Sequence, residues 1–74
     1  MSTKIEKLFT ERDELRSRED WLRRHTIDWQ GWQKLCNRAE RVENRICDVL
    51  GVRHPIYHER SGYLEKYRPA LTHR

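Results

Sequence analysis

The stretch from Trp29 to Leu50 most constrains what this chain can fold into. Its apolar residues recur at alternating intervals of three and four, at Trp32, Leu35, Ala39, Val42, Ile46 and Val49. This is the spacing of a helix that presents one long apolar seam to a partner helix. The seam is widened by four flanking residues, Trp29, Cys36, Cys47 and Leu50. Gly51 comes next, at a position that favours a left-handed residue, so the pattern predicts a helix over about residues 28–50.

A first helix is predicted over about residues 4–24. Thr3 and Glu6 have the spacing of a capping box, which places the helix start near Lys4, and no Gly or Pro interrupts residues 4–24. The seam of this helix repeats the same intervals at Ile5, Leu8, Arg12, Leu15, Glu19 and Leu22. Two of these six positions are charged, and a buried seam should resist both charges.

Residues 25–28, His-Thr-Ile-Asp, form the connection between the two helices. Thr26 or Asp28 can cap the second helix, and Ile27 is expected to act as a hydrophobic staple. A connection this short makes the helices antiparallel neighbours. In that arrangement every seam position meets a seam position, in the pairs Leu22–Trp32, Glu19–Leu35, Leu15–Ala39, Arg12–Val42, Leu8–Ile46 and Ile5–Val49. The sequence therefore predicts an all-α, antiparallel two-helix hairpin.

The chain divides into a helical hairpin at residues 1–51 and a basic aromatic tail at residues 52–74. The net charge is +4, and the tail holds five Lys or Arg against two Asp or Glu. The tail is predicted to be irregular or to carry one short helix. Basic residues interleaved with tyrosines can bind single-stranded nucleic acid, although no known nucleic-acid motif accompanies them. The favoured alternative is a structural tail, whose apolar residues fold back on the hairpin, onto Trp21 or Phe9. These residues are Tyr57, Tyr63, Leu64, Tyr67 and Leu71. The candidate binding residues are Arg53, Arg60, Tyr63, Lys66, Tyr67 and Arg68.

A homodimer forming a four-helix bundle is expected, because small chains usually need added stabilisation. A lone hairpin is expected to leave four residues partly exposed to water, Phe9, Trp29, Cys36 and Cys47. If the first helix packs antiparallel on its own copy, Leu15 meets Leu15 and Arg12 meets Glu19 of the second copy. Polar pairs at seam positions can set register and oligomeric state, so Arg12, Leu15 and Glu19 are the dimer-register candidates.

Three tryptophans cluster in the sequence around the connection. Trp32 belongs to the seam and is predicted to be core, whereas Trp21 is predicted to be exposed. Trp and Arg are enriched at interface hot spots. Trp21, Arg23 and Arg24 are therefore the candidates for binding a protein partner at this end of the hairpin.

No catalytic, cofactor or metal motif is present in the sequence. Cys36 and Cys47 are eleven residues apart, which is roughly 16 Å along a helix, too far for a shared disulfide or metal. The histidines do not have the spacing of a compact zinc site, and the three glycines do not form a phosphate loop. We therefore expect no enzyme activity, no cofactor and no metal.

Met1 is followed by polar and charged residues rather than an apolar run, and no segment approaches the ~20 apolar residues of a membrane span. This pattern predicts a cytoplasmic protein with reduced thiols and no membrane partner. The predicted function is a small non-enzymatic protein that binds and modulates another protein through the hairpin surface. The alternative is a nucleic-acid-binding accessory protein that uses the tail. Hairpins of this size are common in small adaptors, inhibitors and regulators, including many of phages and mobile elements, an analogy of fold alone.

Overall fold

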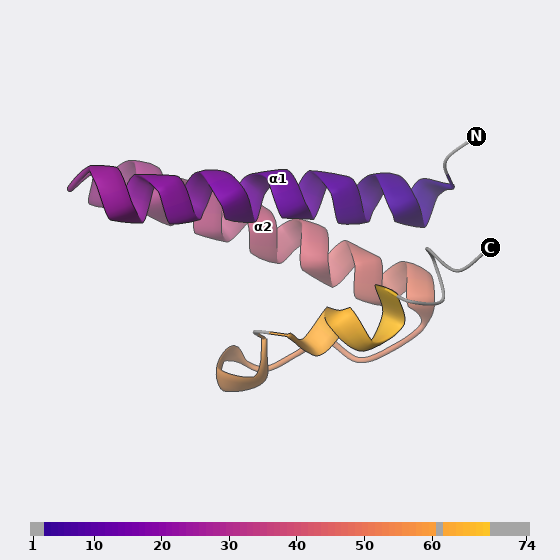
Figure 1. Ribbon diagram of the computed structural model, residues 1–74. Helices are drawn as coiled ribbons and strands as arrows, with labels where there is room; N and C mark the ends of the chain where they lie inside the picture. The colour runs from indigo at the N-terminus through magenta and orange to yellow at the C-terminus, as the bar shows by residue number, and fades with distance from the viewer. Residues whose placement is uncertain (1–2, 61, 69–74) are drawn as a thin grey trace.

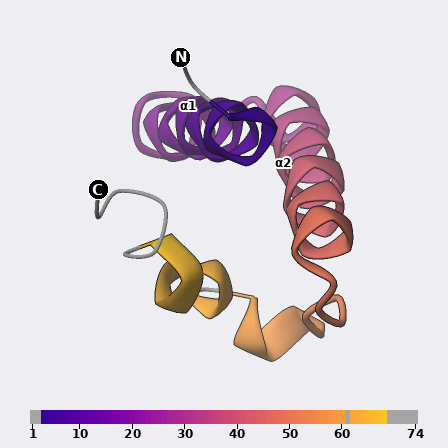
Figure 2. The same ribbon diagram turned by 90° about the vertical axis from the view of Figure 1, so that its right-hand side faces the viewer.

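The protein consists of two long helices followed by a tail with two short helical turns. The computed structural model describes residues 3–60 and 62–68. Helix α1 spans Lys4–His25 and α2 spans Trp29–Leu50, and the 3₁₀ turns η1 and η2 span Tyr57–Glu59 and Tyr63–Tyr67. The two helices are antiparallel and the tail turns back beneath α2 (Figure 1). Seen nearly along the helix axes, α1, α2 and the tail occupy three sides of the molecule (Figure 2). The predicted all-α hairpin is confirmed.

The helix ends follow from local hydrogen bonding. Thr3 Oγ1 accepts from the Glu6 amide at 3.2 Å while the Thr3 amide donates to Glu6 Oε1 at 3.0 Å, so the predicted capping box is present. Asp28 caps α2 by accepting from the Gly31 amide at 2.9 Å. Thr26 instead ends α1, and Gly51 ends α2 in the left-handed region with φ 75°. Of the two predicted caps for α2, the structure thus uses Asp28.

The connection differs from the prediction at Ile27. This side chain is 93% exposed, so the expected hydrophobic staple is wrong. The first turn of α2 is instead secured by Asp28. A Cβ atom on residue 31 would lie 2.3 Å from Asp28 Oδ2, so a larger residue in place of Gly31 would require the Asp28 side chain to shift.

The interface between α1 and α2 is closed at its middle. Leu15 is 4% exposed and Ala39 is fully buried, which agrees with the predicted packing of a large residue opposite a small one. Ile46 is also fully buried, whereas Val49, one turn further along the predicted seam, is 46% exposed. The seam therefore loses its cover at the last turn of α2.

The tail completes the core. Phe9, Ile46, Cys47 and Leu64 form one buried cluster, with Tyr63 and Tyr67 packed against it. We expected Phe9, Cys36 and Cys47 to stay partly exposed in a lone hairpin, and this was wrong, because all three are buried. For Phe9 and Cys47 the cause is Leu64, which lies over them from η2. Trp29 remains exposed, as expected. Of the other tail residues expected to fold back, Tyr57 stays exposed and Leu71 lies outside the described residues.

Candidate interaction surfaces

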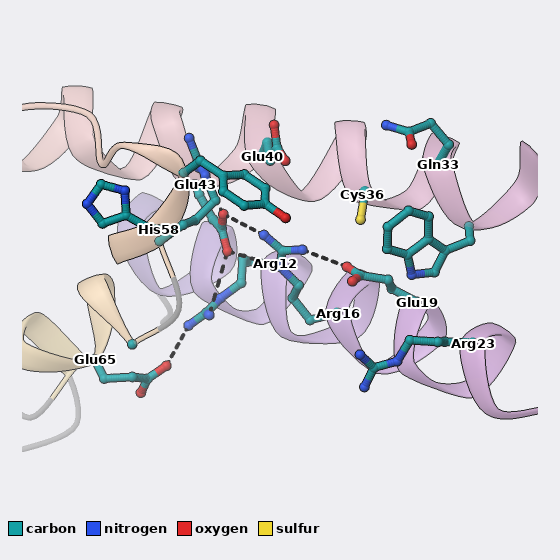
Figure 3. Close-up of a pocket in the computed structure, with 14 residues that line it drawn as sticks. Arg12, Arg16, Glu19, Arg23, Gln33, Cys36, Glu40, Glu43, His58 and Glu65 are labelled. Carbon is teal, nitrogen blue, oxygen red and sulfur yellow. Dashed lines mark hydrogen bonds and ion pairs between the residues drawn. The ribbon is translucent and has the colours of Figure 1, made fainter. Parts of the chain in front are cut away.

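A groove of about 880 Å³ lies where α1, α2 and the tail meet (Figure 3). At its centre is Glu43, whose side chain is only 3% exposed. Arg16 binds both carboxylate oxygens of Glu43, with Nε at 3.1 Å and Nη2 at 2.9 Å, and Arg60 donates to the same carboxylate at 3.0 Å. A buried carboxylate requires such charged partners, and here they come from two different elements.

Further ion pairs extend this network across the groove. Arg12 Nη2 donates to Glu65 Oε1 at 2.9 Å, and Arg12 Nη1 lies 3.8 Å from Glu43. Arg16 also donates to Glu19 at 2.6 Å. The network therefore links α1, α2 and η2 through side chains alone.

The thiol in the groove is not activated as a nucleophile. Burial, together with a hydrogen bond to Glu19, raises the pKa of the Cys36 thiol to about 11, so this cysteine stays protonated near neutral pH. Arg68 and Arg12 lower the pKa of Glu65 to about 2, so its carboxylate stays charged. For Arg16, burial acts to lower the pKa, but hydrogen bonds to Glu43 and Glu19 outweigh it and raise the pKa. The ion pairs of Arg16 and Glu65 thus contribute electrostatically to the stability of the fold.

The dimer-register candidates already have partners within the chain. Arg12 binds Glu65, Glu19 binds Arg16, and Leu15 is buried between the helices. The Arg12–Glu19 match between two copies is therefore not needed to neutralise these charges. The homodimer itself stays a prediction.

The tail residues proposed for binding lie mostly against the protein. Arg60 binds Glu43, and Arg68 donates to both oxygens of Asp13 at 3.0 and 2.9 Å. Arg53 pairs with Glu59, which lowers the pKa of that carboxyl to about 2. Among the other candidates, the Tyr63 hydroxyl donates to the Arg53 carbonyl at 2.7 Å, Tyr67 packs on the core, and exposed Lys66 lies over the Tyr63 ring. The tail thus has a structural role.

Glu43 was missed by sequence reasoning, although the sequence contained a signal for it. The apolar row that widens the seam of α2 repeats every seven residues at Trp29, Cys36 and Leu50, and Glu43 occupies the vacant place in that row. A charged residue in an apolar row indicates a buried ion pair. Its partners were not evident, because Arg16 and Arg60 belong to other elements.

In contrast to the buried ion pairs of the groove, the turn end of the hairpin exposes large apolar side chains. Ile27 is 93% exposed, Trp29 73% and Trp21 55%. Trp21 was correctly predicted to be exposed, but the side chains of Ile27 and Trp29 are more exposed. The Trp21 ring stacks on His25 with centroids 4.7 Å apart. Arg23 and Arg24 both bind the carboxylate of Asp20, each at 3.1 Å.

A cavity of about 190 Å³, the tip pocket, opens at this end. Its apolar walls are Leu22, Ile27, Trp29 and Trp32, and Arg23 and Asp28 stand among the polar residues around it. Trp32, predicted to be core, is only partly buried and borders both the tip pocket and the groove. Its indole N–H is buried without a hydrogen-bond acceptor among the described residues.

Comparisons with protein families, curated proteins and solved structures find no match. Within residues 3–60 and 62–68, no group of three or more His, Cys, Asp or Glu side chains is arranged to hold a metal ion. None of the described helices is long and apolar enough to cross a membrane. Any inference about function must therefore come from the described surfaces of the molecule, including the groove and the tip pocket.

Proposed function

We propose that this protein is a small non-enzymatic interaction protein that binds and modulates another protein through the turn end of the hairpin. The observation that carries the proposal is the exposure of Ile27 and Trp29 beside the tip pocket. Large apolar and aromatic side chains around a small pocket are the usual anchors of protein interfaces. At the other end of the hairpin Leu64 covers the core, although Val49, Ile56 and Tyr57 are exposed there.

The size of the tip pocket favours a protein partner over a small molecule. Ligand pockets typically measure roughly 300–1,000 Å³. At about 190 Å³, the tip pocket has room for one side chain. The proposal places the protein in the cytoplasm, where thiols such as those of Cys36 and Cys47 stay reduced.

A photo-crosslinking experiment tests the proposal. A benzophenone amino acid replaces Trp29 in one variant and exposed Lys34 of the same helix in a matched control. Both variants are expressed in the source organism and irradiated. We expect a protein that crosslinks to position 29 and not to position 34, and that is lost when Ile27→Ser is added. Equal yields from both positions, or none, contradict the proposal.

Binding of nucleic acid through the tail stays a prediction, and the described contacts do not favour it. Arg53, Arg60 and Arg68 each bind a carboxylate of the same chain. A gel-shift series in rising salt checks this alternative, because binding driven by phosphate contacts weakens steeply with salt.

A further inference from the structure

The outer face of α2 presents a row of basic side chains that line neither the groove nor the tip pocket. Intervals of four, three and four residues place them in one line along the helix, at Lys34, Arg38, Arg41 and Arg45. This basic stripe is roughly 16 Å long. All four residues are exposed, on the side of α2 opposite the buried Ala39. α1 and the described part of the tail lie on the inner side of α2 (Figure 2).

The chain does not neutralise the basic stripe. None of its four side chains makes a hydrogen bond, ion pair or ring contact with any residue that the structure describes. Of the acidic residues of α2, Glu40 and Glu43 line the groove. Asp48 lies beyond the last residue of the stripe, and its carboxylate is 2.7 Å from His54 Nε2. The stripe is therefore a row of positive charge without a partner among the described residues.

The basic stripe works against the stability of α2. Lys34 and Arg38 are four residues apart, as are Arg41 and Arg45, and like charges at this spacing repel each other on a helix. On α1, by contrast, basic side chains have nearby carboxylates, as where Arg23 and Arg24 both bind Asp20. Helix stability alone therefore does not account for the stripe, whereas an anionic partner would relieve its repulsion.

The surroundings of the stripe favour a nucleic acid over an acidic protein. Protein interfaces are centred on large apolar and aromatic side chains. Among the described residues, none of the exposed large apolar side chains lies between Trp29, which borders the tip pocket, and Val49, which follows the stripe. Nucleic-acid interfaces instead derive much of their affinity from contacts of Lys and Arg with phosphates. Proteins that bind single strands add aromatic side chains on which bases stack, and this face has none, so a duplex is the better match.

We propose that the basic stripe of α2 binds the phosphate backbone of a nucleic-acid duplex without reading its sequence. Three of its four residues are arginines, whose planar guanidinium groups can each bind two phosphate oxygens. Four contacts of this kind give a slope of about −3 to −4 when the logarithm of affinity is plotted against the logarithm of salt concentration. The duplex lies along α2 and leaves the turn end free for a protein partner.

Fluorescence anisotropy with a labelled DNA duplex of random sequence, about 20 base pairs long, tests this site. We expect the full chain to bind the duplex at about 50 mM KCl with the salt slope given above, and the matching single strand at least about fivefold more weakly. No binding at this salt concentration overturns the proposal. Equal or tighter binding of the single strand overturns the assignment to a duplex.

A matched pair of double variants locates the site. Lys34→Gln with Arg41→Gln removes two charges from the stripe, whereas Lys7→Gln with Arg18→Gln removes the same residue types from exposed positions of α1. We expect the first variant to bind the duplex about tenfold or more weakly at about 50 mM KCl and to make the salt slope shallower by about 2. The second should lose less than about threefold. Equal losses overturn the assignment to the stripe. Because Gln is a good helix former, circular dichroism should show unchanged helicity in both.

Two competing explanations have their own readouts. If poly-glutamate displaces the duplex at equal concentration of charge, the stripe recognises an acidic protein surface, and the assignment to nucleic acid is overturned. The Ile27→Ser, Trp29→Ser double variant should bind the duplex as the wild type does, whether or not the turn end binds a protein. A loss of duplex binding in that variant would place the duplex at the turn end instead.

Discussion

The two ends of this hairpin share one apolar seam but have different surroundings. At the end that holds Phe9 and Ile46, the tail supplies Leu64 and closes the core. At the turn end, Ile27 and Trp29 face solvent beside an open pocket. The comparison teaches that the periodic seam decides how α1 and α2 pair, while the tail decides which end has a closed core. Stability should therefore depend on the covered end and binding of a protein partner on the turn end.

Removing the tail should have the largest effect on this contrast. A chain that ends at Val52 lacks Leu64 and exposes Phe9 and Cys47, so we expect it to lose at least about 3 kcal/mol of unfolding free energy and most of its cooperative melting. Far-UV circular dichroism during heating measures both. Leu64→Ala in the full chain provides a milder version of the same loss. A truncated chain with unchanged helicity and melting would show that the helices around Phe9 are stable without the tail.

Glu43→Ala should have the next largest effect. The substitution leaves Arg16 and Arg60 without their buried carboxylate, and loss of one partner of a buried ion pair costs about 3 kcal/mol or more. Glu40, one turn earlier on α2, also lines the groove but makes no ion pair with any residue that the structure describes. Glu40→Ala should cost less than about 0.5 kcal/mol. Urea unfolding measures the free energy of unfolding of both variants. Similar losses would contradict the central role of Glu43 in the ion-pair network.

Acid should loosen the tail by a smaller amount. In the folded protein the pKa of Glu65 is about 2, below its ordinary value of 4.5. A carboxyl with a lowered pKa stabilises the fold above its unfolded pKa, and this contribution is lost as the pH falls from about 4.5 toward 2. We expect Glu65→Gln to lose less stability than the wild type over this range in urea titrations. Glu14→Gln, at an exposed position, is the control and should follow the wild type.

The turn end should be nearly indifferent to substitution as far as folding is concerned. Ile27→Ser removes a side chain that is 93% exposed, so the free energy of unfolding should change by less than about 0.5 kcal/mol. Thermal melting of this variant beside the wild type measures the change. A loss above about 1 kcal/mol would mean that Ile27 supports the fold, and the division between the two ends would fail.

The sequence predicts the hairpin well because its determinants are local. The capping box of Thr3 and Glu6, the Asp28 cap and the left-handed Gly51 each act within a few residues, so each can be recognised from spacing alone. Leu15 and Ala39 follow from the periodicity of two neighbouring helices. These features fix the elements and their antiparallel pairing.

The tail and the charge network are less accessible from the sequence. Arg60 and Arg68 were interpreted as candidates for binding a partner, because a count of basic residues does not show that their carboxylates, Glu43 and Asp13, lie on distant helices. A tail folded back on Phe9 was one alternative, but the expectation that Phe9 stays partly exposed was wrong, since Leu64 covers it. At the turn end, the tryptophans were noticed but the exposure of Ile27 was not, because a staple was expected there.

The ion pairs between α1 and the tail have a consequence for how the chain matures. Arg12 binds Glu65 and Asp13 binds Arg68, across separations of 53 and 55 residues. Closing so long a loop carries an entropy cost that the short turn between the helices avoids, so the hairpin can form before the tail docks. During synthesis from the N-terminus, Phe9 must therefore wait for Leu64 to leave the ribosome before it is covered. Until then the nascent hairpin exposes apolar surface at both ends. Docking of the tail then covers the apolar surface at the end that holds Phe9.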